Sequence, residues 1–72
     1  MKNKHVFFRI RDLREDNDLT QQQVADSLGL YLTQYRRYEN GESEVPAYII
    51  KELCEIYKVS SDYLLGITND LK

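Results

Sequence analysis

The sequence predicts an all-α domain built from five helices, and three observations support this. Apolar residues recur at three- and four-residue spacing in successive segments, and no segment alternates as an amphipathic strand would. The one proline and the three glycines punctuate these segments. The connections between segments are short, so that consecutive helices are expected to pack as neighbours. We therefore expect one compact domain over residues 1–72.

The first helix is expected from Val6 to Asp16, with an apolar stripe of Phe7, Ile10 and Leu13. Asn17 and Asp18 follow, and both residue types tolerate the left-handed backbone on which helices often end. The second helix begins after Thr20, a good N-cap. Gln23 stands three residues further on, which is the spacing of a capping box. This helix ends at Gly29.

The third helix is expected from about Tyr31 to Asn40, where an Asn-Gly pair ends it. At 3.6 residues per turn, Tyr31, Tyr35 and Tyr38 fall on one side of this helix. The fourth helix is expected to start with Pro46 as its first residue and to run to about Lys58. Its apolar positions are Ile49, Ile50, Leu53, Cys54, Ile56 and Tyr57. The fifth is capped by Ser60 and closed by Gly66.

Composition and charge narrow the class of protein. The net charge is −2, but residues 1–40 carry seven Lys and Arg against six Asp and Glu, including every arginine. A local basic face is therefore compatible with the acidic total. The single cysteine, Cys54, cannot form an internal disulfide and is expected to be a buried thiol. Without a long apolar run or a secretory signal, the sequence predicts a cytoplasmic protein with no membrane segment.

The spacing within residues 20–40 is typical of a DNA-binding helix-turn-helix. Counted from Gln21, a small residue stands at the fifth position (Ala25) and a glycine at the ninth (Gly29). Two helices that cross steeply need a small side chain where their backbones approach, and the turn needs a residue without a Cβ penalty. The apolar positions between the helices are Val24, Leu28, Leu30, Tyr35 and Tyr38.

The chain resembles the lambda-repressor/Cro-like helix-turn-helix family, also called the XRE family. The residues that carry the resemblance are LTQQQVADSLG, YRRYENGE, the proline at 46 and KVSSDYLLG at 58–66. The resemblance implies the family's five-helix fold, and it implies that the third helix enters the major groove of double-stranded DNA. The residues it places at the base edges are Leu32, Thr33, Gln34, Arg36 and Arg37. Arg37 suits guanine, whose O6 and N7 match a guanidinium fork.

The resemblance also assigns contacts to the DNA backbone. Gln21 matches the family's phosphate-binding glutamine at the start of the second helix, where free N–H groups face an anion. The other residues assigned to the backbone are Thr20, Tyr31, Asn40 and Ser43. Arg14 and Glu39 match a pair that relatives form between the first helix and the end of the third. Such a pair fixes the angle of the third helix and adds little net stability.

The sequence departs from the family pattern at two places. Tyr31 stands where a Ser or Thr usually caps the third helix, and the lost cap should cost roughly 1 kcal/mol. This cost is expected unless Tyr31 packs on the second helix or touches the sugar-phosphate. Tyr35 and Tyr38 replace aliphatic residues, so that their hydroxyl groups need hydrogen-bond partners or an exposed edge.

Two functions from different classes stay open. The favoured one is a sequence-specific transcriptional repressor that binds a palindromic operator as a homodimer, with half-sites about 34 Å apart. The dimer contact is expected at the fifth helix and the C-terminal tail, although Leu65, Ile67 and Leu71 could equally cover the core. The alternative is a protein-interaction module, such as an antitoxin or adaptor. We find no nucleophile, phosphate loop or metal-binding cluster, and expect neither catalysis nor a cofactor.

Overall fold

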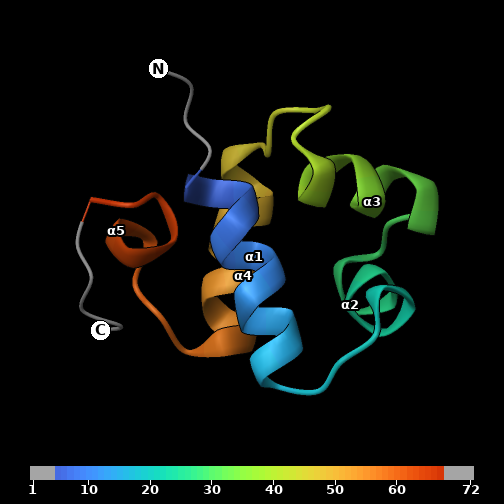
Figure 1. The fold of residues 1–72 in the computed structure, drawn as a ribbon, viewed down its shortest axis with the longest axis horizontal. Helices are drawn as coiled ribbons and strands as arrows, with labels where there is room; N and C mark the ends of the chain where they lie inside the picture. Colours follow the sequence, from blue (N-terminus) through green and yellow to red (C-terminus); the bar gives the residue numbers. More distant parts are fainter. Residues whose placement is uncertain (1–4, 68–72) are drawn as a thin grey trace.

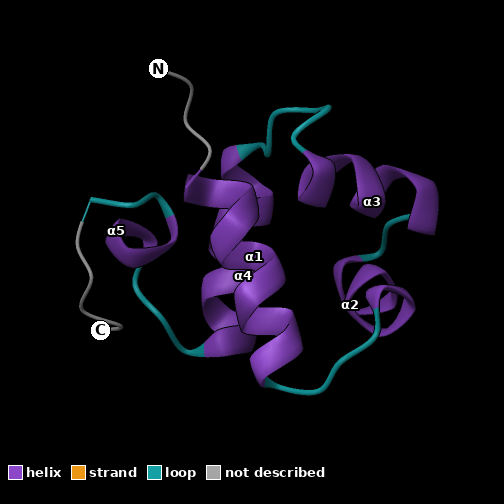
Figure 2. Ribbon diagram, viewed as in Figure 1, coloured by secondary structure: helices purple, strands orange, loops and turns teal. Residues whose placement is uncertain are grey.

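The computed structural model describes residues 5–67, with side chains from residue 9 onward. Within this range all regular secondary structure is helical (Figure 2). The five helices are α1 (His5–Asp16), α2 (Gln21–Leu28), α3 (Leu32–Asn40), α4 (Ala47–Tyr57) and α5 (Ser61–Leu64). The prediction of an all-α, five-helix fold is therefore confirmed. None of the helices described is long and apolar enough to cross a membrane.

α1 lies between the α2–α3 pair and α5, and α4 lies behind it in the view of Figure 1. On one side, α2 and α3 pack against each other, and α3 also packs against α1. On the other side, α5 packs against both α4 and α1. α2 also packs against α4, which connects the two sides of the molecule. The α2–α3 pair is thus attached to a base made of the other three helices.

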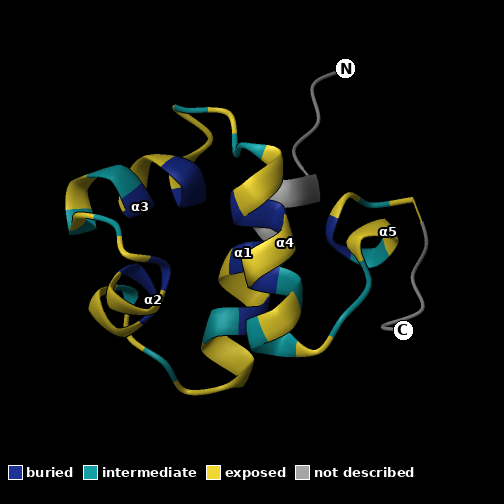
Figure 3. Ribbon diagram, turned by 180° about the vertical axis from the view of Figure 1, so that it is seen from behind, coloured by how far each residue is buried: buried dark blue, intermediate teal, exposed yellow. Residues whose placement is uncertain are grey.

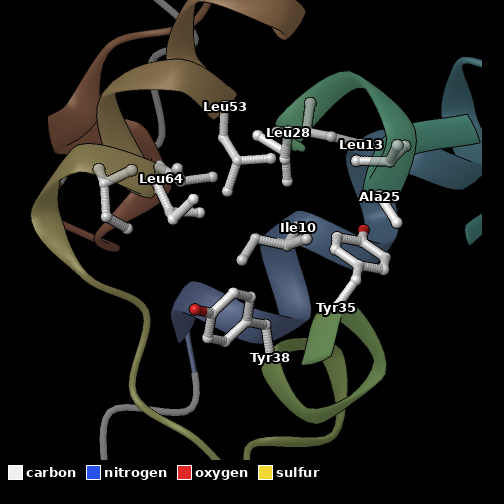
Figure 4. Packing of buried hydrophobic residues seen from close by; sticks show 11 residues of the cluster. Ile10, Leu13, Ala25, Leu28, Tyr35, Tyr38, Leu53 and Leu64 are labelled. Carbon is white, nitrogen blue, oxygen red and sulfur yellow. The ribbon is translucent and has the colours of Figure 1, made fainter. Parts of the chain in front are cut away.

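Eleven apolar residues form a single core to which all five helices contribute (Figure 4). Tyr35 and Tyr38 reach into it from α3, on the side where Ile10 projects from α1. Ile10, Tyr35, Leu53 and Leu64 are completely buried, and these residues come from four different helices. The whole set comprises Ile10, Leu13, Val24, Ala25, Leu28, Tyr35, Tyr38, Ile49, Ile50, Leu53 and Leu64. Since every helix buries part of this core, the position of α3 depends on the whole domain.

The predicted ends of α1 and α2 are confirmed in detail. Asp18 follows α1 with a left-handed backbone (φ 57°). The Thr20 hydroxyl accepts a hydrogen bond from the Gln23 backbone N–H at 3.0 Å, and the Gln23 side chain accepts one from the Thr20 N–H at 2.8 Å. This reciprocal pair is the capping box that the sequence predicts.

The predicted start of α4 is wrong by one residue. Pro46 is the N-cap of α4, with an extended backbone (ψ 157°), and the helix begins at Ala47. The Pro46 carbonyl accepts hydrogen bonds from both Ile49 and Ile50, as an N-cap carbonyl does. Tyr31 occupies the N-cap position of α3 with an extended backbone, as the family pattern predicts, so the helix itself begins at Leu32. Because Tyr31 lies outside the helix, its side chain is 88% exposed and does not join the buried face of Tyr35 and Tyr38.

The burial of Cys54 needs correction, and the exposure of the residues after α5 bears on an alternative that the sequence left open. Cys54 is half-buried, because it lies in the wall of an open groove between α4 and α5 rather than in the core. Burial nevertheless raises the pKa of its thiol, which disfavours the reactive thiolate. Leu65 and Ile67 are 43% and 70% exposed, so they do not cover the core. Leu71 lies outside the described residues.

Candidate nucleic-acid interface

The turn between α2 and α3 has the geometry that the sequence spacing predicts. Gly29 adopts a left-handed backbone (φ 70°), and its N–H donates to Asp26 O at 3.1 Å. The next N–H, of Leu30, donates to Ala25 O at 2.9 Å. These two bonds end α2 tightly, and the completely buried Ala25 leaves room for α3. The chain therefore turns from α2 into α3 within three residues, at 29–31.

One side of α3 is open to solvent along the helix (Figure 3). Thr33, Arg36 and Arg37 are exposed, while Leu32 and Gln34 are half-buried. No described residue forms a hydrogen bond or an ion pair with the Arg37 side chain. The structure thus places the five predicted base-contacting residues on an accessible part of α3, and the guanidinium of Arg37 is available to a ligand.

The opposite side of α3 is held by a buried carboxylate. Glu39 is only 5% exposed, and Tyr35, one turn earlier, donates its hydroxyl hydrogen to Glu39 Oε2. The predicted pair is present, because Arg14 Nε donates to Glu39 Oε2 at 2.6 Å and Arg14 Nη2 to Glu39 Oε1 at 3.2 Å. Gln21 Nε2 also donates to Oε1, at 3.1 Å. Glu39 therefore accepts four hydrogen bonds, which matches the capacity of a carboxylate.

These bonds determine the charge state of the group. Burial alone would raise the pKa of the Glu39 carboxyl, but the hydrogen bonds that it accepts outweigh burial and hold its pKa below the usual value. Burial, together with the bond to Glu39, raises the pKa of Tyr35 far above its ordinary value. Glu39 is therefore an anion at neutral pH, and Tyr35 is a permanent hydrogen-bond donor to it.

Arg14 connects this anion to the start of α2. Its Nη1 donates to the Leu19 carbonyl at 2.9 Å, immediately before the N-cap Thr20. One guanidinium thus holds the α1–α2 connection and the end of α3 at the same time. This contact gives a physical basis for the expectation that the Arg14–Glu39 pair sets the angle of α3.

Four of the residues predicted to contact phosphates lie at the ends of the two helices, and Ser43 lies in the loop that follows α3. Gln21 is half-buried at the start of α2, and its Oε1 accepts a hydrogen bond from Arg36 Nε at 3.2 Å. Thr20 and Asn40 are exposed, and Ser43 is half-buried. Tyr31 makes no capping hydrogen bond, so the cap is absent as the sequence predicts. Its side chain is 88% exposed, so it does not pack on α2.

Sequence reasoning missed the bonds that Tyr35 and Gln21 make to Glu39. The first had a local signal, because residues four apart in a helix lie on the same face. Tyr35 and Glu39 have this spacing, and the tyrosine hydroxyl needed a partner. The second had no signal, since Gln21 and Glu39 are 18 residues apart and meet only when α2 and α3 cross.

A second tyrosine in the same region supplies a prediction. The Tyr57 hydroxyl is buried and has no hydrogen-bond partner among the described residues. An unsatisfied buried hydroxyl costs about 1–3 kcal/mol. We therefore expect Tyr57→Phe to leave the free energy of unfolding unchanged or to raise it by up to about 1 kcal/mol. Tyr35→Phe should lower it by about 1–3 kcal/mol, because Glu39 loses a donor. Urea denaturation of the two variants measures this contrast.

The pH dependence of stability gives an independent check. Burial raises the pKa of Tyr57 to about 12 from an ordinary value of 10.0. A raised pKa in the folded state contributes stability below pH 10 that is lost as the pH rises towards 12. Tyr57→Phe should therefore lose less stability than the wild type in this window. A loss above 1 kcal/mol for Tyr57→Phe at neutral pH would show that the hydroxyl does have a partner.

Comparison with known proteins agrees with this geometry. The helix-turn-helix family model matches residues 10–64, from the core of α1 to the end of α5. The match thus includes α2, α3 and the Arg14–Glu39 pair. No solved structure gives a significant match to the chain.

Curated relatives are found in several bacteria. YobD of Bacillus subtilis, an uncharacterized HTH-type transcriptional regulator, is 37% identical over 62 residues, which are 86% of this chain and 55% of that protein. The phage transcriptional repressor RstR of Vibrio cholerae is 33% identical over 58 residues, or 81% and 52%. The antitoxin PezA of Streptococcus pneumoniae is 37% identical over 57 residues, or 79% and 36%. The chain thus spans about half or less of each relative. By the family match and the helix-turn-helix geometry, it belongs to the lambda-repressor/Cro-like (XRE) helix-turn-helix family of transcriptional regulators.

Proposed function

We propose that this protein is a sequence-specific repressor that reads the major groove of double-stranded DNA with α3. The observation that carries the proposal is the two-sided character of α3. Its inner side is fixed to the core by Tyr35, Tyr38 and Glu39, whereas Arg37 on its outer side has no partner among the residues described. A rigid helix with an unpaired guanidinium fork is suited to reading base edges. The similarity to RstR, a transcriptional repressor, supports the same function.

We further propose that the protein binds a palindromic operator as a homodimer in the cytoplasm. The described residues extend 29 Å along the longest axis. This length is slightly less than one turn of B-DNA, about 34 Å, so that two copies fit on successive turns. The exposed Leu65, which lines the α4–α5 groove, and the exposed Ile67 supply apolar surface for the contact between copies.

An interaction module is the second candidate, and the similarity to the antitoxin PezA favours it. The net charge of −2 and the exposed acidic residues Glu42 and Glu44 are unfavourable for a surface that approaches phosphates. In this function the main partner would be another protein.

Selection from random duplex DNA at two salt concentrations distinguishes the two functions. For a repressor we expect an enriched palindromic site, and log K should fall with log salt at about −0.9 per phosphate neutralised. Gln21→Ala should weaken all sequences alike. If no sequence is enriched and binding is weak even at low salt, DNA reading is contradicted and a protein partner should be sought.

A further inference from the structure

In the free protein, both polar atoms of the Gln21 side-chain amide form hydrogen bonds. Its Oε1 accepts from Arg36 Nε at 3.2 Å, and its Nε2 donates to Glu39 Oε1 at 3.1 Å. The amide cannot be reversed, because an ionised carboxylate only accepts and a guanidinium only donates. Gln21 is therefore oriented by its neighbours before any ligand arrives.

The Glu39 carboxylate, to which Gln21 donates, is itself held in place by further hydrogen bonds. Arg14 holds both oxygens of Glu39, and the Tyr35 hydroxyl donates to Oε2 from one helical turn away. Tyr35 is completely buried and Glu39 nearly so. Neither residue is accessible to DNA, so any influence they have on binding must pass through Gln21 and Arg36.

Several hydrogen-bond donors of Gln21 and Arg36 remain unused within the described residues. Gln21 Nε2 carries two hydrogens and gives one to Glu39. Arg36 is exposed and uses its Nε, while its Nη1 and Nη2 groups make no hydrogen bond to any residue in the described range. An amide N–H and a guanidinium thus lie beside each other where α2 meets α3. A phosphate oxygen pair fits such donors.

We propose that Gln21 and Arg36 together hold one DNA phosphate, and that Tyr35 and Glu39 are the positioning residues for this contact. The proposal rests on the DNA-binding function proposed above and deepens it. It moves Arg36 from base reading, where the sequence resemblance placed it, to the DNA backbone. Arg37, which forms no hydrogen bond with a described residue of α2, keeps the base-reading role.

The joint action of Gln21 and Arg36 is tested on exposed or half-buried side chains, whose removal leaves the core intact. We expect Arg36→Ala to weaken all duplexes alike and to lower the salt slope by roughly 0.9, as the loss of one phosphate contact does. The double variant Gln21→Ala, Arg36→Ala should bind more tightly than the product of the two single effects predicts. Relaxed preference at one base position in Arg36→Ala, or effects that multiply, would overturn the shared contact.

The positioning role is tested with two tyrosines that lose the same atom. Tyr35→Phe should weaken binding of the selected duplex by roughly fivefold, the equivalent of one net hydrogen bond, with unchanged base preference. Tyr57→Phe, whose hydroxyl has no partner among the described residues, should bind like the wild type. In the free protein, Tyr35→Phe should also shift the Gln21 side-chain amide resonances, whereas Tyr57→Phe should not.

The outcomes separate this proposal from the one on which it rests. Failure of the wild type to bind any duplex contradicts the DNA-binding function. Wild-type binding together with unchanged affinity and unchanged Gln21 resonances in Tyr35→Phe contradicts the positioning role alone. If Tyr35→Phe does not fold, the double-variant comparison of Gln21 and Arg36 still decides whether the phosphate contact is shared.

Discussion

Replacing Glu39 with alanine should lower the free energy of unfolding by about 3–5 kcal/mol, the range measured when one partner of a buried ion pair is removed. The variant leaves the Arg14 guanidinium with only the longer ion pair to the exposed Glu15, at 3.9 Å, and the buried Tyr35 hydroxyl without its acceptor. A domain of this size has a total stability of only about 5 kcal/mol. We therefore expect Glu39→Ala to be largely unfolded at 37 °C, as measured by circular dichroism and urea denaturation.

The matched control is Glu42→Ala, which removes the same charge from an exposed position and should change stability by less than about 0.5 kcal/mol.

The pH dependence of the stability difference between wild type and Glu39→Ala gives a further check. Because the pKa of Glu39 is lowered in the folded protein, its stabilisation is present above about pH 4.5 and is lost as the pH falls through the folded-state pKa. The difference between wild type and Glu39→Ala should therefore narrow in acid. A constant difference at all pH values would mean that the carboxylate charge is not the cause.

Replacing Arg37 with alanine should remove the preference for guanine at one position in each half-site, which is equivalent to about 1–3 kcal/mol of discrimination. Arg37 is exposed and has no partner among the described residues, so the loss should appear in DNA binding and not in stability. Competition binding with the selected operator and with single-base variants of it measures the effect. An unchanged ranking of these duplexes would exclude Arg37 from base reading.

Arg37→Lys is the sharper comparison for the same residue. Lysine keeps the charge, but it lacks the planar fork that matches O6 and N7 of guanine. We expect this variant to keep the salt slope of the wild type and to lose most of the preference. If Arg37→Lys behaves like the wild type, the arginine acts as a point charge near a phosphate.

Much of the fold could be predicted because its signals are local. The Thr20–Gln23 capping box and the αL backbone of Gly29 follow from residues at most four apart. The spacing of Ala25 and Gly29, which are also four residues apart, indicates two crossing helices. Local reasoning failed by one residue at Pro46, because the fixed φ of proline suits both an N-cap and the first helical position. The accessible face of α3 was likewise predictable, since periodicity separates Arg37 from Tyr35 and Tyr38.

The connections beneath that face required the tertiary structure. The sequence indicates Arg14 and Glu39 as a pair through family resemblance, but not that Glu39 also binds Tyr35 and Gln21. These groups come from three helices and meet in a small buried volume, where a carboxylate is stable only if each of its lone pairs finds a donor. Which donors satisfy it depends on the crossing of α2 and α3. That crossing, and with it the orientation of Gln21, is a property of the packed core and not of any single segment.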